Sequence, residues 1–428
     1  MQILSAKNYS LSVLLVRVRR NPKKAQNVEN AVRKILDDVR QNKDKALFSL
    51  AKKFDGAQLF SLRVSKKEIA EAYAQESAAV IAALRVAKTA IEKFERASLM
   101  REPKVVTATG VKVWREFRPI ERVGLYIPGG KAVYPSTVLM LGVPAKIAGC
   151  KEVVLCVPPD PNGKAPSAVL VAADLCGITK IFKVGGAQAI AAMAYGTQSI
   201  PKVSKIFGPG NQYVTTAKLL VYGEVDIDMP AGPSEVLVFA DESANPSWIA
   251  ADLLAQLEHS EDAQAILVTL SKKVAQEVRK EMFRQCKSLS RQRILCESLK
   301  NSFGLVFTGL EKALRFINEY APEHLEIVSR KESEILAKVI NAGSVFLGAY
   351  SSEPLGDYAT GSNHTLPTGG YAKMFSPLSL ASFGKKMQIQ KISKTGMKNL
   401  QTTVETLAER EGLDAHKNAI SIRFKKNI

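Results

Sequence analysis

Apolar positions recur at helical spacing through the first quarter of the chain. Between residues 25 and 100 they stand three or four apart, which places them on one face of an amphipathic helix. Two runs show this spacing: Val28, Ala31, Val32, Ile35 and Val39, and then Ile81, Leu84, Ala87, Ile91 and Phe94. We therefore expect helices over 25–100.

From about residue 105 the pattern changes to short runs rich in β-branched residues. These runs predict strands at 123–127, 152–157, 180–184 and 205–207. Helical stretches lie between them, for example 166–176 and 187–195. Alternation of this kind is typical of an α/β fold, in which helices cover a parallel sheet.

A second α/β block follows a break at 226–234, where Pro230, Gly232 and Pro233 interrupt regular structure. Its expected elements are helices at 246–258, 271–287 and 310–319, and strands at 265–270, 304–307 and 343–347. Residues 351–378 are rich in Ser, Gly, Pro and Thr and are expected to form a long functional loop.

The last fifty residues contain one clear amphipathic helix, expected over 397–411 and ended by Gly412. Its apolar face carries Met397, Leu400, Val404 and Leu407. A tail this short cannot bury that face alone, so it must dock on the body or on a partner subunit.

Composition narrows the class of protein. The net charge of +19 invites a nucleic-acid interpretation. However, the charge is spread along the chain, and no basic run is interleaved with aromatic residues. We favour a solvated basic surface with no nucleic-acid partner, compatible with anionic ligands such as a dinucleotide.

The cysteine content and the hydropathy of the chain indicate the cellular compartment of the protein. Five cysteines without a C-x-x-C pair favour free thiols in a reducing cytoplasm. No apolar run reaches 18 residues, so we expect no membrane span. The apolar run 11–16 precedes Arg17, which reverses the order of a signal peptide, and no cleaved leader is expected.

The four histidines carry the first candidate chemistry, because histidine moves protons near neutral pH and binds metals. Three of them, His259, His324 and His416, have an acidic residue within two positions. Gln256 lies three residues before His259 and shares its helix face. With Asp357 and His416, these two residues form a ligand set suited to zinc or manganese, although a solvated face also explains Gln256.

Glu323 and His324 follow Pro322, a residue suited to the first turn of a helix. We expect a helix to start here and to present an acid and a base to two sides of one pocket. The alternative is an ordinary helix start, with Glu323 near the positive end of the dipole.

Glycine-rich turns at 127–130, 184–188 and 207–211 each follow a predicted strand. Exposed backbone N–H groups at such turns bind phosphate. None of the turns matches G-x-G-x-x-G, so the nucleotide signal from the pattern alone is moderate.

Seven ordered segments identify a resemblance to the histidinol dehydrogenase family. They are YIPGG (126–130), GGAQAIAAMAYGT (185–197), GPGN (208–211), AGPSEV (231–236), APEHLE (321–326), GSNHTLPTGG (361–370) and EGLDAHK (411–417). Together they extend over some 300 residues in family order, and they are far more specific than any single motif.

The resemblance implies roles for individual residues. Glu323 and His324 match the catalytic pair. The positions that match zinc ligands, one zinc per subunit, are Gln256, His259, Asp357 and His416. The positions that match NAD contacts are Tyr126, Gln188 and Asn211. The positions that match substrate contacts are Ser234, Gln256, His259, His324, Asp357, His364, Glu411 and His416.

The resemblance also implies the architecture: two incomplete Rossmann-like domains with parallel-rich sheets, plus small N- and C-terminal helical segments that dock across a homodimer. The expected division is an N-terminal extension (1–24), a larger catalytic and metal-binding domain (25–104 and 236–378), an NAD-contacting domain (105–235) and a dimer-crossing tail (379–428). That tail would carry Glu411 and His416 into the partner's site.

The implied reaction is oxidation of L-histidinol through L-histidinaldehyde to L-histidine with two NAD, in the cytoplasm. One alternative is a related zinc- and NAD-dependent dehydrogenase acting on another small alcohol, such as a sulfonated diol. Glu411 argues against it, because a carboxylate repels a sulfonate. A basic nucleic-acid-binding protein that has lost activity is the alternative from another class, and the intact ligand and acid–base positions argue against it.

Overall fold

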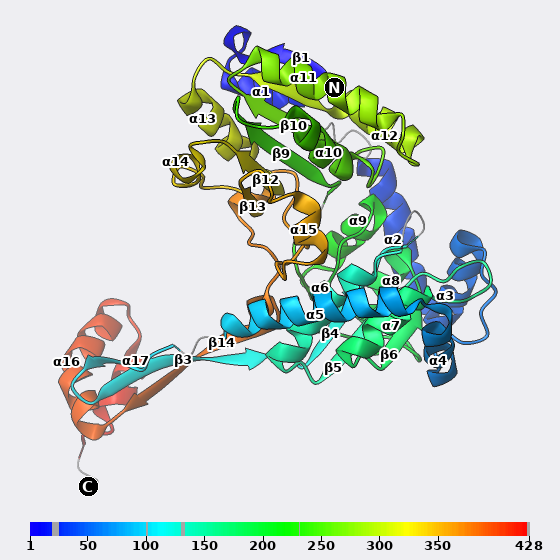
Figure 1. The fold of residues 1–428 in the computed structure, drawn as a ribbon. Helices are drawn as coiled ribbons and strands as arrows, with labels where there is room; N and C mark the ends of the chain where they lie inside the picture. Colours follow the sequence, from blue (N-terminus) through cyan, green and yellow to red (C-terminus); the bar gives the residue numbers. More distant parts are fainter. Residues whose placement is uncertain (19–24, 100–101, 130–132, 231, 426–428) are drawn as a thin grey trace. The chain divides into compact units, whose positions relative to one another are not determined.

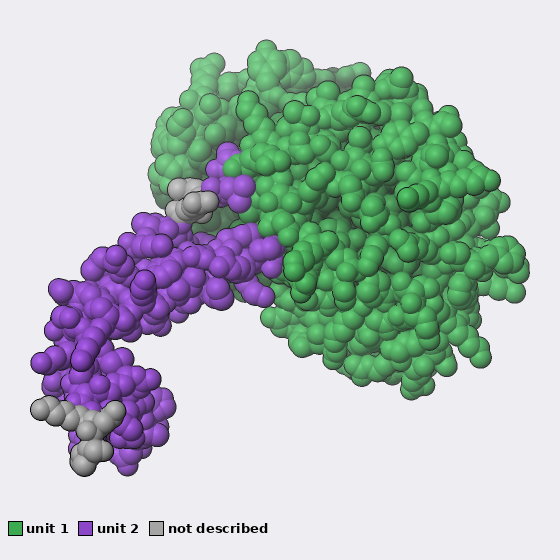
Figure 2. Space-filling view, turned by 90° about the horizontal axis from the view of Figure 1, so that it is seen from below, with its two compact units in different colours: residues 1–96, 120–383 green, residues 97–119, 384–428 purple. Residues whose placement is uncertain are grey.

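The computed structural model describes residues 1–18, 25–99, 102–129, 133–230 and 232–425. These residues form two compact units, coloured separately in Figure 2. The larger unit comprises residues 1–96 and 120–383, and the smaller one comprises residues 97–119 and 384–428.

One parallel sheet of the larger unit is formed by strands from the middle of the sequence (Figure 1). Its strands are β4 (Arg122–Tyr126), β5 (Glu152–Val157), β6 (Lys180–Lys183), β7 (Lys205–Phe207) and β8 (Asp226–Ile227). The order β6-β5-β4-β7-β8 places the first strand beside the fourth. The chain direction across the sheet reverses between β4 and β7, where open α/β sheets bind ligands beyond the strand carboxyl ends.

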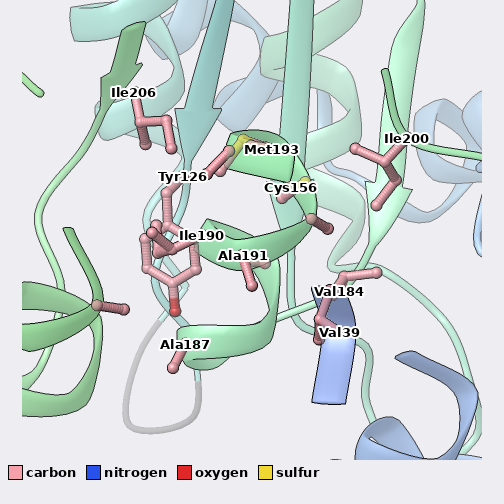
Figure 3. Packing of buried hydrophobic residues seen from close by; sticks show 14 of the residues in the cluster. Val39, Tyr126, Cys156, Val184, Ala187, Ile190, Ala191, Met193, Ile200 and Ile206 are labelled. Atoms are coloured by element: carbon pink, nitrogen blue, oxygen red, sulfur yellow. The ribbon is translucent and has the colours of Figure 1, made fainter. Parts of the chain in front are cut away.

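Helices connect and cover these strands. They are α6 (Pro135–Ala148), α7 (Ser167–Cys176), α8 (Gly186–Tyr195) and α9 (Gln212–Val221). Two helices from the start of the chain, α2 (Ala25–Asn42) and α3 (Asp44–Leu50), join the same hydrophobic core. Figure 3 shows Val39, Tyr126 and Ile190 among the buried side chains of this cluster.

The second parallel sheet contains β1 (Gln2–Ser5), β9 (Glu235–Ala240), β10 (Gln264–Thr269), β11 (Phe303–Val306), β12 (His324–Val328) and β13 (Ser344–Leu347). The order is β1-β11-β10-β9-β12-β13, so β9 and β12 are neighbours at its centre. Every residue of β9, β10 and β12 is buried, and alternate residues of β9 belong to two separate core clusters. Near-continuous apolar runs of this kind are typical of parallel strands covered on both faces.

The helices around this sheet are α1 (Leu11–Val18), α10 (Pro246–Leu257), α11 (Lys272–Cys286), α12 (Gln292–Ser298), α13 (Leu310–Tyr320), α14 (Glu332–Leu336) and α15 (Glu353–Tyr358). Short 3₁₀ or π turns occupy Ala6–Asn8, Ala51–Asp55, Leu299–Asn301, Tyr371–Lys373 and Leu380–Phe383. The expected α/β fold with parallel-rich sheets is confirmed.

The expected helix start at Glu323 is wrong. Helix α13 ends at Tyr320, and Ala321 adopts a left-handed conformation with φ of 54° that turns the chain. Strand β12 then begins at His324. The apolar residues that follow, Leu325 and Ile327, pair with β9 at the centre of the six-stranded sheet. This tertiary pairing overrides the preference of Pro322 for a helix start.

Two helices occupy residues 66–97. The first, α4 (Lys66–Gln75), starts with a capping box in which Ser65 and Glu68 each bond the other's backbone N–H, and the second is α5 (Ala78–Ala97). Lys183, at the end of β6, donates to Glu68 Oε1 at 2.8 Å. This ion pair connects the start of α4 to the sheet.

The smaller unit is an antiparallel sheet with two helices. Its elements are β2 (Val105–Ala108), β3 (Val111–Pro119), β14 (Gly384–Ile392), α16 (Lys394–Arg410) and α17 (Asp414–Ser421). Helix α16 covers most of the expected helix over 397–411, whereas strand β14 was not predicted. Within this unit Leu407 remains 58 % exposed, so the apolar face of α16 is only partly covered.

No described helix is both long enough and apolar enough to cross a lipid bilayer. The five cysteines are free thiols.

Candidate functional site

The amino ends of β9 and β12 bring Glu323 and His324 together. His324 Nδ1 lies 3.1 Å from the carbonyl oxygen of Glu235, and Glu323 Oε2 accepts from Glu235 N at 2.8 Å. A carbonyl oxygen only accepts, so Nδ1 must be the donor. In the neutral ring, Nε2 therefore carries the free lone pair.

His324 Nε2 is buried and has no hydrogen-bond partner in the described part of the chain. It lies 3.8 Å from Glu353 Oε1 and 3.8 Å from Asp357 Oδ1. Burial lowers the pKa of His324, and the nearby Asp357 carboxylate opposes this only in part. The ring is therefore neutral at neutral pH, with an acceptor nitrogen ready to take a proton.

A candidate metal centre lies beside this nitrogen. Ligand atoms of His259, Glu353 and Asp357 all lie within 4.8 Å of one another. Gln256, in the last turn of α10, is completely buried, and neither polar atom of its amide has a hydrogen-bond partner among the described residues. Buried polar atoms without a partner are costly, so the Gln256 amide fits a position that contacts a bound cation. An imidazole, an amide oxygen and carboxylates suit a divalent cation such as zinc.

Glu353 was not among the predicted site residues; it is buried and lies four residues before Asp357 on α15. The available signal was this spacing, which places both carboxylates on one helix face. Burial, followed by the Asp357 carboxylate, raises the pKa of Glu353 to about 10.

Two further carboxyl groups, those of Glu326 and Asp252, accept hydrogen bonds from the start of α15. Glu326 Oε1 accepts from Glu353 N at 2.8 Å, and Ser352 Oγ donates to Asp252 at 2.5 Å. Burial raises the pKa of both Glu326 and Asp252. The wall of the site is therefore acidic and dry.

His364 has both ring nitrogens engaged. Nδ1 donates to the carbonyl oxygen of Asp357 at 3.2 Å, and Nε2 lies 3.1 Å from Thr137 Oγ1 on α6. Asn363 Nδ2 donates to Met140 O at 2.7 Å on the same helix. His364 therefore connects the Asp357 segment to α6. Ser234 lies directly before β9, at the edge of the sheet that carries Glu323 and His324.

The three residues expected at an NAD site gather at the carboxyl edge of the other sheet. Tyr126 ends β4 and accepts from Gly186 N at 3.1 Å through its hydroxyl. Gln188 is buried in the first turn of α8. Asn211 caps α9 by accepting from Tyr213 N at 3.0 Å.

The turn after β7 is held by a buried ion pair. Lys218 Nζ donates to Gly208 O at 3.0 Å and to Asp228 Oδ1, while Gly208 N donates to Asp228 Oδ2 at 2.8 Å. Both charged side chains are 3 % exposed or less. Gly208 has φ of 122°, and a Cβ there would lie 2.1 Å from Tyr126 O. Only glycine fits this approach of the turn to β4.

The remaining predicted residues, Glu411 and His416, belong to the smaller unit. Glu411 is the C-cap residue after α16, and His416 lies in α17. Both side chains are exposed within the described chain. The larger unit by itself brings the ligand atoms of His259 and Asp357 together, and Gln256 lies three residues before His259 on the chain.

Comparisons with known proteins agree on one family. The histidinol dehydrogenase family profile matches residues 18–424. The chain is 54% identical over 402 residues to histidinol dehydrogenase of Bacteroides fragilis, covering 94% of each chain. It is 50% identical over 403 residues to that of Vibrio parahaemolyticus, covering 94% of this chain and 93% of the relative. The crystal structure of histidinol dehydrogenase from Elizabethkingia anophelis superimposes with a TM-score of 0.95 at 48% identity, covering 99% of this chain and 98% of that one.

Proposed function

The chain belongs to the histidinol dehydrogenase family of NAD-dependent oxidoreductases, and we propose that it oxidises L-histidinol to L-histidine through L-histidinaldehyde, using two NAD. The observation that carries this proposal is the buried Nε2 of His324, which faces Asp357 and has no hydrogen-bond partner among the described residues. A dry site with a positioned base suits the removal of a hydroxyl proton as hydride leaves.

His324 is the proton acceptor in both halves of the reaction. The carbonyl oxygen of Glu235 holds Nδ1 as the donor, so Nε2 takes the hydroxyl proton. Its lowered pKa keeps the ring unprotonated before the reaction. The same nitrogen accepts the proton of the aldehyde hydrate in the second half.

Glu323 serves the second half. Its Oε2 accepts from Glu235 N, which fixes the carboxylate beside His324. An oriented carboxylate can accept a proton from the water that attacks the aldehyde. The hydrate so formed is then oxidised like the alcohol.

Gln256, His259 and Asp357, with His416 from the tail, hold one zinc per subunit in this proposal. The orphaned amide of Gln256 and the oxygen and nitrogen donors around it fit that ion. Zinc bound there supplies a cationic anchor for the imidazole and amino nitrogens of the substrate. Positioning of this kind contributes several kcal/mol to catalysis.

Substrate contacts extend beyond the metal residues. Ser234 and His364 line the larger unit's side of the pocket, and Glu411 pairs with the cationic part of the substrate. The 105–235 domain provides the NAD contacts Tyr126, Gln188 and Asn211, while 236–378 provides the catalytic pair. We further propose a cytoplasmic homodimer whose tails complete the neighbouring sites, which encloses the reactive aldehyde.

The catalytic pair is tested by measuring each half-reaction, with histidinol and with histidinaldehyde. His324→Gln should slow both halves by about 10²–10⁴, the usual contribution of a general base. Glu323→Gln should slow the aldehyde half by a similar factor and the alcohol half far less, because only the aldehyde half needs an activated water.

The matched control is Glu311→Gln, which neutralises a carboxylate that is 72 % exposed and should leave both halves unchanged. Equal losses in both halves for Glu323→Gln would contradict the division of labour. No NADH from histidinol with the wild-type protein would overturn the function itself.

A further inference from the structure

Glu235 contacts both members of the proposed catalytic pair through its main chain. Its carbonyl oxygen accepts from His324 Nδ1 at 3.1 Å, and its N donates to Glu323 Oε2 at 2.8 Å. The register pairs His324 with Val236, so the residues before them, Glu323 and Glu235, face each other at the amino ends of β12 and β9. The orientation of both side chains therefore depends on where the backbone of Glu235 lies.

The carboxylate of Glu235 connects that backbone to two other segments of the chain. The side chain is almost completely buried. Its Oε1 accepts from Gly369 N at 3.0 Å, and its Oε2 accepts from the Tyr320 hydroxyl at 3.0 Å. Gly369 belongs to the loop that carries His364, and Tyr320 ends α13 four residues before His324. One carboxylate thus joins the start of β9 to the segments on either side of β12.

Tyr320 is itself held in place by a buried amide. Its hydroxyl lies 2.8 Å from Gln264 Oε1. Gln264 Nε2 donates to Val18 O at 2.8 Å and to Asn301 O at 2.7 Å, which fixes the amide orientation and leaves Oε1 as an acceptor. Gln264 is the first residue of β10, so Glu235 is anchored to that strand as well.

We propose that Glu235 is a positioning residue, whose carboxylate fixes the start of β9 so that the backbone there orients His324 and Glu323. The carbonyl oxygen of Glu235 then holds the His324 ring in the tautomer with the proton on Nδ1. This inference rests on the proposed function, in which His324 is the proton acceptor. The Gly369 and Tyr320 donors are neutral groups, so the side chain acts through its length and not through its charge.

Two substitutions separate length from charge in the full-length protein. Glu235→Gln keeps the length, because its Oε1 can accept from Gly369 N and its Nε2 can donate to the Tyr320 oxygen. Glu235→Asp keeps the charge but is one methylene shorter, so it cannot reach both partners unless the backbone moves. With histidinol, kcat should stay near the wild-type value in Glu235→Gln. It should fall by about 10²-fold in Glu235→Asp, as a displacement of about 1 Å can cause, with a smaller change in KM.

The matched control is Glu95→Asp. Glu95, on α5, is also almost completely buried, and its Oε2 accepts from Leu380 N at 2.8 Å. This variant therefore shortens another buried carboxylate that binds a loop, and its kcat should remain at the wild-type value. A loss in Glu95→Asp equal to that in Glu235→Asp would show a general effect of shortening such a side chain and would overturn the proposal.

The tautomer of His324 provides a readout that does not depend on turnover. The chain has four histidines, so nitrogen NMR of protein labelled with ¹⁵N-histidine resolves few rings, and His324→Gln identifies the signals of His324. Wild type and Glu235→Gln should show a proton on Nδ1, whereas Glu235→Asp should show a mixture of tautomers. If Glu235→Asp does not fold, Tyr320→Phe removes one of the two contacts and should shift the same signals.

Three results would overturn the positioning role. They are unchanged His324 signals in the variant that loses a contact, wild-type kcat in Glu235→Asp, and a kcat in Glu235→Gln as low as in Glu235→Asp. Failure of the function is seen separately, because it requires that the wild-type protein form no NADH from histidinol, whereas the NMR signals need no substrate.

Discussion

At the scale of single residues, the sequence predicted several members of the candidate site but not the buried carboxyl group beside them. Gln256, His259 and Asp357 were predicted as ligands. Ligand atoms of His259 and Asp357 lie within 4.8 Å of each other, and the buried amide of Gln256 has no hydrogen-bond partner among the described residues. Glu353 was missed because its meaning depends on burial and on the direction of α15, which no local pattern shows. The tautomer of His324 likewise depends on the carbonyl of Glu235, a residue from another strand.

A substitution at Gln256 should have opposite effects on the stability of the zinc-free protein and on its zinc affinity. An unsatisfied buried polar group costs about 1–3 kcal/mol, and an apolar side chain of similar shape removes that cost. Gln256→Met should therefore raise the free energy of unfolding of the zinc-free protein by about that amount, while zinc affinity falls.

Urea denaturation in the presence of a chelator measures the first effect, and chelator competition measures the second. A zinc-free variant less stable than the wild type would show that the amide has a structural role instead.

At the scale of elements, the alternation of strands and helices was predictable because parallel strands read as apolar runs. The exception was the segment at Glu323 and His324, which was predicted as a helix start. Pairing of β12 with β9 makes this segment the start of a strand instead. The two candidate sites also use opposite edges. The expected NAD residues lie at carboxyl ends of strands, as the general rule predicts, whereas Glu323 and His324, the proposed catalytic pair, lie at the amino ends of β9 and β12.

The buried Lys218–Asp228 ion pair should govern both stability and NAD binding. Asp228→Asn leaves the Lys218 charge without its counter-ion, and breaking such a pair costs roughly 3–5 kcal/mol. The Gly208 turn should lose its support, so the KM for NAD should rise more than the KM for histidinol.

The double variant Lys218→Met/Asp228→Leu removes both charges and should recover much of the lost stability in urea denaturation. A double variant no more stable than Asp228→Asn would contradict this account of the pair.

The start of α4 should give a pH-dependent contribution to stability. Partial burial raises the pKa of Glu68, but hydrogen bonds from Lys183 and Ser65 outweigh it, so the net pKa is lowered from 4.5. A carboxyl group with a depressed folded-state pKa stabilises the fold above its unfolded pKa, and this contribution is lost as pH falls through the folded value.

Glu68→Gln should therefore lower the free energy of unfolding by about 1 kcal/mol at pH 7. The difference from the wild type should shrink as the pH is lowered below 4.5. Denaturation curves at several pH values measure it, with Glu311→Gln as the exposed control. A difference independent of pH would show that the charge of Glu68 is not responsible.

At the scale of the whole molecule, the sequence indicated that the tail could not stand alone. The structure adds that β14 pairs along its whole length with β3, from Gly384 opposite Pro119 to Ile392 opposite Val111. This pairing joins segments more than 260 residues apart, which local pattern cannot reveal. Leu407 is still exposed within the smaller unit, as a docking face requires.

Mixed dimers test whether the tail serves a neighbouring subunit. His324→Gln and His416→Asn are each expected to be inactive. If sites are shared, refolding an equal mixture should restore up to about one quarter of wild-type activity, by random pairing in a symmetric dimer. Restored activity is measured as NADH formation from histidinol. No recovery would mean that each tail serves its own subunit.

The edge strand β1 has a consequence for synthesis of the protein on the ribosome. Among the described residues its only neighbour in the sheet is β11, with Gln2 opposite Phe303. At about 5–20 residues per second, translation needs roughly 15–60 s to add the intervening chain. Ile3 and Leu4 must stay unpaired through that interval, so the nascent protein completes its six-stranded sheet with a segment that was made long before its partner.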